Sequence, residues 1–139
     1  MRDEIKSLLR DRRHCVMATA ANDQPYCSLM VYAVNADCTR LFMVTRRNTR
    51  KYRNLKNNPY VSLLVDSRDI AQPQALTIEG VFEEVAGDSE KKQIQHQLTA
   101  EQPGLQTLLD SPDAAIISVT INSVVFLNGL TEAYREPIE

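Results

Sequence analysis

The sequence predicts a mainly β fold, an antiparallel barrel whose ends are covered by helices. Apolar segments rich in β-branched residues recur along the chain at strand length, and short turns join several of them. Helical periodicity is confined to short segments around these strands. Short connections favour antiparallel pairing over a doubly wound parallel sheet, because parallel strands need long crossover connections.

Composition and charge narrow the class of protein. The 139 residues are 43% hydrophobic, which is enough for one domain with its own core. The formal net charge of -2 argues against nucleic acid as a general partner. Residues 1–13 are highly charged, so we expect neither a signal peptide nor a membrane span there.

The cysteines and histidines predict neither disulfides nor a metal site. The chain has three cysteines, Cys15, Cys27 and Cys38, and no C-x-x-C motif. Because an odd number of cysteines cannot all pair within the chain, we expect reduced thiols and a cytoplasmic location. His14 and His96 are far apart in sequence and have no ligand spacing. We therefore expect no metal, and no catalytic acid or base stands out.

Six segments have the composition and length of strands, namely residues 15–20, 26–34, 41–44, 61–65, 75–85 and 114–127. Turn residues at 22–25 join the first two, so we expect these two strands to pair antiparallel. Gly80 breaks the alternation of the fifth strand, which indicates a bulge or a sharp bend. The last segment is one long strand or two shorter strands divided near residues 122–123.

Two helices are expected in the first half of the chain. Ile5, Leu8 and Leu9 have the spacing of an amphipathic helix, which we place at residues 2–12. A second helix is capped by residue 48 or 49 and is ended by the sequence Asn57-Asn58-Pro59.

The second half is expected to contain a helix, a shorter helical piece and a tail. Asp88 and Ser89 cap a helix that runs to about residue 98. A short helical piece follows within residues 99–109, interrupted at Pro103. The polar tail, residues 129–139, is expected to be ordered only against a partner.

The segment 44–55 is the strongest candidate for a binding site. Between Arg40 and Val65 there are seven lysines and arginines and no acidic residue. Arg50 and Lys51 fall in the first turn of the expected helix, where free backbone N–H groups favour an anion and cations oppose the dipole. A bound anion would offset that cost. Composition alone leaves open the alternative of a solvated, charged helix face.

Two other features each allow a simple and a functional interpretation. The strand around residues 25–32 is either an ordinary core strand or the support of a flat aromatic ligand, with Ser28 as a polar contact. Glu83 and Glu84 are neighbours on a strand, so they point to opposite faces and are interpreted as residues that keep a sheet edge soluble.

Five motifs lie between about residues 15 and 129, and the spacing of two of them, Thr-x-x-x-Thr-Arg-Lys followed by Asn-Pro-x-Val, is fairly specific in combination. The five motifs are Asp23-Gln24-Pro25-Tyr26, Thr45-x-x-x-Thr49-Arg50-Lys51, Asn54-Leu55-x-x-Asn58-Pro59-x-Val61, Thr77-x-Glu79-Gly80 and Phe126-Leu127-Asn128-Gly129. This combination resembles the pyridoxamine 5′-phosphate oxidase-like, FMN-binding split-barrel superfamily. The resemblance implies one domain over residues 1–139, a six-stranded antiparallel split β-barrel. It also implies a homodimer with two FMN sites at the subunit interface.

The resemblance further implies which residues bind FMN. Arg50 and Lys51 would bind the phosphate with the help of Thr49. Thr45 and the backbone of Val44 would contact the polar tail or the ring, and a strand would run beneath the isoalloxazine. The full candidate set is Ser28, Leu29, Met30, Val31, Val44, Thr45, Arg46, Thr49, Arg50 and Lys51. No role is given to Arg46, and the remaining cations, Arg47, Arg53 and Lys56, are expected to face solvent.

Departures from the family pattern separate this chain from true pyridoxamine-phosphate oxidases. Those enzymes resemble this sequence but carry an arginine at the position of Ser28 and a lysine at that of Ala33. Their C-terminal Arg-x-His pair would fall near Ala133 and Arg135, and it is not kept. A phosphorylated substrate would therefore lose charged partners.

The implied function is that of an FMN-dependent oxidoreductase with an unassigned small-molecule substrate. The alternatives are a deazaflavin-dependent reductase, a non-catalytic flavin- or haem-binding stress protein, and a basic helix that binds an acidic partner.

Overall fold

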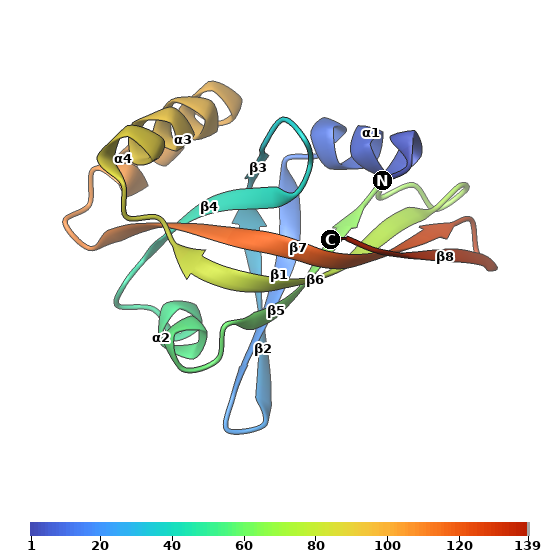
Figure 1. Ribbon diagram of the computed structural model, residues 1–139, viewed down its shortest axis with the longest axis horizontal. Coiled ribbons are helices and arrows are strands. Elements are labelled where there is room, and N and C mark those ends of the chain that lie inside the picture. Colours follow the sequence, from blue (N-terminus) through green and yellow to red (C-terminus); the bar gives the residue numbers. More distant parts are fainter. Residues whose placement is uncertain (139) are drawn as a thin grey trace.

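The computed structural model of the protein describes residues 1–138, whose strands form one curled antiparallel sheet with helices at its margins (Figure 1). The strands are β1 (His14–Ala21), β2 (Gln24–Val31), β3 (Ala33–Val34), β4 (Arg40–Arg46), β5 (Tyr60–Asp66), β6 (Gln74–Glu84), β7 (Ala114–Asn128) and β8 (Glu132–Pro137). The helices are α1 (Asp3–Asp11), α2 (Arg50–Asn57), α3 (Asp88–Glu101) and α4 (Leu105–Leu109). The predicted class, a mainly β split barrel with peripheral helices, is confirmed.

The strand order shows how the barrel curls. The order is β2-β1-β5-β6-β7-β4-β3, and β8 pairs with β7 beyond the end of β4. β2 and β3 lie at opposite ends of this order, yet only Tyr32 separates them in sequence. The two edges of the sheet are therefore joined by a single residue, and the sheet must curl until β2 approaches β4.

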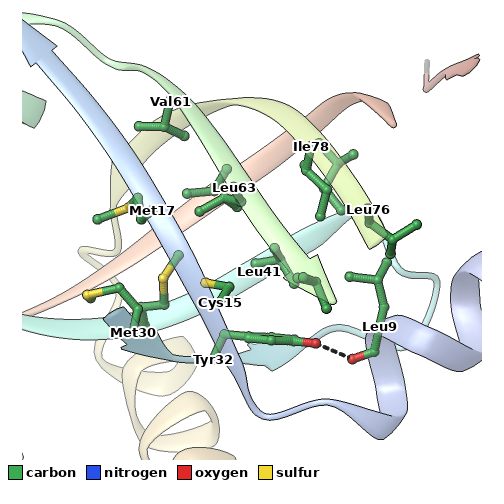
Figure 2. Packing of buried hydrophobic residues seen from close by; sticks show 14 of the residues in the cluster. Leu9, Cys15, Met17, Met30, Tyr32, Leu41, Val61, Leu63, Leu76 and Ile78 are labelled. Carbon is green, nitrogen blue, oxygen red and sulfur yellow. Dashed lines mark hydrogen bonds between the residues drawn. The ribbon is translucent and has the colours of Figure 1, made fainter. Parts of the chain in front are cut away.

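Two strands were missed in the sequence, which explains why the sheet has eight strands and not six. The segment 26–34 is divided because Tyr32 turns its ring into the core, where its hydroxyl donates a hydrogen bond of 2.6 Å to the carbonyl of Leu9 (Figure 2). The expectation for the tail was wrong. Gly129, at φ 79°, reverses the chain, so that β8 pairs with the second half of β7 in the same chain.

Gly80 produces the irregularity that was predicted for it. The register between β6 and β7 shifts between Glu79 and Gly80, as at a β-bulge. A Cβ atom on Gly80 would lie 2.5 Å from Val119 Cγ1 and 2.6 Å from the carbonyl oxygen of Thr120. Close approach of β7 therefore requires glycine here.

The core has two parts, one on each side of β4 and β7. The larger fills the concave side of the sheet and includes the fully buried Met17, Leu63 and Ile78 (Figure 2). The smaller contains Val44 and is covered by α3 and α4, of which α4 packs against β4 and β7 and α3 packs against β3 (Figure 1). α1 closes the larger core with its buried apolar residues, as its periodicity predicts.

The helices agree with the sequence except in their limits. α3 extends three residues beyond the expected end at 98, and its N-cap is Gly87, without a side-chain cap from Asp88 or Ser89. The break at Pro103 separates α3 from α4, as predicted. Within residues 1–138, no helix is long and apolar enough to cross a membrane.

Candidate functional site

The turn between β4 and α2 is organised by two threonine hydroxyls. Thr49 is the N-cap of α2: its hydroxyl accepts a hydrogen bond from the backbone N–H of Tyr52 at 3.3 Å and donates one to the carbonyl of Arg46 at 2.8 Å. Of the two predicted caps, Thr49 is therefore the right one. Its oxygen lies 3.5 Å from that of Thr45, which is 2% exposed. The structure thus brings both predicted hydroxyls together at the start of the helix.

Two of the arginines in the turn form ion pairs with carboxylates. Arg46 Nε lies 3.0 Å from Asp113 Oδ1, and Arg47 Nη2 lies 2.6 Å from Glu84 Oε2. Arg47 also donates a hydrogen bond of 2.7 Å to the carbonyl of Ala114. Arg47 is exposed, as expected, but its ion pair with Glu84 was not predicted; it forms because β6 and β7 bring their ends alongside the turn.

Glu84 also corrects an expectation. It was interpreted as a residue that keeps a sheet edge soluble, but its second oxygen accepts a hydrogen bond from the hydroxyl of Tyr52. Partial burial raises the pKa of Glu84, and the hydrogen bonds from Tyr52 and Arg47 outweigh this, so the pKa lies below its ordinary value. The hydrogen bond to Glu84 and burial raise the pKa of Tyr52. The carboxylate form of Glu84 is thereby stabilised.

Arg50 and Lys51 differ from these two arginines. Within residues 1–138, neither has a carboxylate within ion-pair distance. The guanidinium carbon of Arg50 lies 4.4 Å from the centroid of the Tyr26 ring, so the side chain reaches from α2 toward β2. Two cations thus remain beside the free N–H groups of the first turn of α2.

Buried contacts fix α2 against the sheet. Asn54, which is 6% exposed, donates a hydrogen bond of 3.1 Å to the hydroxyl of Thr19 on β1. Leu55 on the same helix is 1% exposed and belongs to the larger core. The first turn of the helix, with its cations, therefore has a fixed position relative to the sheet.

The predicted flavin support on β2 is divided between two faces. Ser28 pairs with Met17, and Met30 pairs with Cys15, so both lie on the concave face. Leu29 is 67% exposed and, like Val31, belongs to the opposite face. A flat ring on one face can therefore contact only one pair of the four residues.

Val44 contributes to the turn only through its backbone. Its side chain is buried in the smaller core beneath the C-terminal helices. Any contact between Val44 and a ligand at the turn would therefore involve its backbone.

Sequence reasoning gave no role to several residues that shape the site. These are Asp113, Thr19, Asn54 and Tyr26, together with Glu84 as the partner of Arg47 and Tyr52. Tyr26 and Asn54 stand in two of the five motifs, and Asn54 also precedes the apolar Leu55 on α2, so these two residues had a signal in the sequence. Within residues 1–138, no group of three or more histidine, cysteine or acidic side chains could hold a metal ion.

Comparison with known proteins adds sequence and structural relatives. Residues 1–128 match the sequence model of the pyridoxamine 5′-phosphate oxidase family. A Schizosaccharomyces pombe protein named as a pyridoxamine 5′-phosphate oxidase homologue is 38% identical over 72 residues, which cover 45% of this chain and 37% of that protein. The chain therefore matches well under half the length of this curated relative.

Two solved structures share the fold at low sequence identity. A FAD-binding protein of Mesorhizobium loti has a TM-score of 0.77 and 18% identity, with 91% of this chain and 94% of that chain covered. A heme-binding protein of Mycobacterium smegmatis has a TM-score of 0.84 and 16% identity, with 99% of this chain and 59% of that chain covered. The descriptions of these two proteins refer to different ligands, and at 18% and 16% identity the similarities show the fold alone. The match over residues 1–128 shows that the chain belongs to the pyridoxamine 5′-phosphate oxidase family.

Proposed function

We propose that this protein binds FMN as a homodimer and acts as an oxidoreductase on a small-molecule substrate. The observation that carries the proposal is the contrast between two pairs of cations. Arg46 and Arg47 are neutralised by carboxylates, whereas Arg50 and Lys51 have no carboxylate partner within residues 1–138. A dianionic phosphate is the ligand that best matches two such cations at a helix start.

The donors around the turn fit a phosphate ester. The backbone N–H groups of the first turn of α2 and the two cationic side chains supply charge-assisted hydrogen bonds. The hydroxyl of Thr49 already donates a hydrogen bond to the backbone carbonyl of Arg46, so Thr49 acts first as the cap that orients these groups. Bound flavin would supply the redox chemistry, while the chain supplies binding and orientation. The Mesorhizobium loti relative, described as FAD-binding, supports a flavin as the ligand.

The apolar outer face of the sheet supports the proposed homodimer. Val16 pairs with both Leu29 and Leu64, which places the three side chains in one row across β2, β1 and β5. Leu29 is 67% exposed and Leu64 40%, and a soluble chain gains by covering such a row. A second copy is the proposed cover, which would bring Leu29 and Val31 into an interface. Light scattering on the purified protein tests this; a monomer at all concentrations would refute it.

Titration with FMN tests the ligand. We expect tight binding to the wild type and a loss of about a hundredfold or more in Arg50→Ala/Lys51→Ala, because two charge-assisted contacts are removed. Arg53→Ala is the matched control, since Arg53 is an exposed cation on the same helix. Equal affinity of the double variant and the control would remove the phosphate assignment. Oxidation of NAD(P)H by the FMN-loaded protein then tests whether it is an enzyme or a carrier.

Heme is the second candidate ligand, and one observation favours it. His14 lines a hollow of about 440 Å³ together with Leu29, three arginines and two carboxylates, namely Arg12, Arg13, Arg68, Asp11 and Asp66. Arg68 is paired with Asp66 at 3.0 Å and Arg13 with Glu101 at 2.7 Å, so within residues 1–138 Arg12 is the cation of this hollow that has no carboxylate at ion-pair distance. An imidazole, a cation and an apolar side chain are groups that could bind the iron, a propionate and the macrocycle of a heme. An absorption spectrum after addition of hemin, with His14→Ala as the variant, tests this.

A deazaflavin phosphate would use the same basic turn as FMN, and a competition experiment between the two ligands shows which of them the protein prefers.

A further inference from the structure

We infer that Glu84 is a positioning residue for the phosphate site, acting through Arg47 and Tyr52. The inference rests on the proposed function, because the phosphate is the ligand whose site Glu84 would position. Glu84 stands at the end of β6, far in sequence from α2, and its side chain is 26% exposed. It is thus a partly buried anion placed beside a basic turn.

Each oxygen of the Glu84 carboxylate holds a different part of the site. Oε2 pairs with Arg47 Nη2 at 2.6 Å, just after β4, and Oε1 accepts the hydroxyl hydrogen of Tyr52, in the first turn of α2. A carboxylate with two acceptor oxygens can hold both groups at once, whereas a neutral amide has one acceptor.

The three proposed phosphate-binding residues lie between the two residues that Glu84 holds. Thr49, Arg50 and Lys51 follow Arg47 and precede Tyr52, so both ends of this short segment are tied to one carboxylate. This arrangement, in which Glu84 holds both Arg47 and Tyr52, is also attached to the sheet. The backbone N–H of Arg47 donates a hydrogen bond of 2.8 Å to the carbonyl of Asp113, at the entrance to β7.

Glu84 also decides which cation is available to a ligand. Its charge neutralises Arg47, whose guanidinium carbon lies 6.0 Å from the centroid of the Tyr52 ring. Although partial burial raises the pKa of Glu84, hydrogen bonds from Tyr52 and Arg47 hold that pKa below its ordinary value, so this charge persists into mildly acidic solution. A ligand-binding residue keeps its productive geometry when neighbouring side chains hold it in place.

The experiment compares FMN with riboflavin, which has the same ring but no phosphate. Dissociation constants for both are measured by fluorescence quenching on wild type, Glu84→Ala, Glu84→Gln and Glu83→Ala. Glu83 is an exposed neighbour on the same strand and serves as the control. We expect Glu84→Ala to weaken FMN binding by about tenfold, the lower end of the loss seen when outer partners of metal ligands are removed, while riboflavin affinity changes little. Glu84→Gln keeps one acceptor, so its loss should be smaller.

The outcomes separate this inference from the proposed function. If the wild type shows no preference for FMN over riboflavin, the phosphate site is absent and both proposals are lost. If the wild type prefers FMN and both Glu84 variants keep that preference, only the positioning role is refuted. Equal weakening of FMN and riboflavin would show a general structural effect and would overturn it as well. Tighter FMN binding in Glu84→Gln would mean that withholding Arg47 from the ligand is the main effect of Glu84, and the positioning role would be refuted.

Discussion

The side-chain amide of Asn54 donates a buried hydrogen bond of 3.1 Å to the hydroxyl of Thr19, which joins α2 to β1. Asn54→Ala leaves that hydroxyl with no partner from the helix, and we expect it to lower the free energy of unfolding by ~1–3 kcal/mol. Urea denaturation measures the loss. Arg53→Ala, an exposed change one residue away, is the control. A loss no larger than that of the control would show that the hydrogen bond contributes nothing to stability.

Gly80→Ala should destabilise the sheet, because the new methyl would lie 2.5 Å from Val119 Cγ1 and 2.6 Å from the carbonyl oxygen of Thr120. Relief requires a backbone shift of β6 or β7, at a cost of ~1–3 kcal/mol. Gly104→Ala is the matched control, since nothing lies within 4 Å of the added atom. Equal thermal midpoints for the two variants would contradict this account of the bulge.

Tyr32→Phe removes the hydroxyl that donates a hydrogen bond of 2.6 Å to the carbonyl of Leu9 near the end of α1. The ring stays in the core, so the expected loss is that of a buried carbonyl left unpaired, ~1–3 kcal/mol of unfolding free energy. The measurement is chemical denaturation followed by circular dichroism. A neutral result would mean that the position of α1 does not depend on this hydrogen bond.

Stability should depend on pH through Glu84. Its pKa lies below its ordinary value in the folded protein, so in acid the unfolded chain binds the proton first. The stability that its ion pair contributes is therefore complete above the unfolded pKa, near 4.5, and is lost as the pH falls through the lower folded pKa. Urea unfolding at a series of pH values should show a weaker acid dependence in Glu84→Gln than in the wild type. Parallel curves would refute this assignment.

Local patterns predicted the parts of the site that are close in sequence. A threonine before a polar helix predicted the cap of α2, and the break in alternation at Gly80 predicted the bulge. The partners of Arg46 and Arg47 were not predictable, because Asp113 and Glu84 reach the turn only through the pairing of β6, β7 and β4. Local propensity carries no information about such distant registers.

Two strands escaped prediction for different physical reasons. The sequence of β8 is polar and has no clear alternation, since five of its six residues are exposed and neither face is buried in a core. The break between β2 and β3 was hidden because Tyr32 has the composition of a strand residue. Its ring is 2% exposed, and only the tertiary structure shows that it ends one strand and begins another. The candidate flavin support was likewise predicted as one stretch, although alternation divides it between two faces.

The passage of the chain through Tyr32 has a consequence for how the barrel opens. Val31 ends the strand at one edge of the sheet and Ala33 begins the strand at the other, so neither edge can fray far without pulling this tyrosine out of the core. Local unfolding of the two edges should therefore be a single cooperative event. In native-state hydrogen exchange, the protected backbone amides at the end of β2 and those of β3 should therefore show the same free energy of opening.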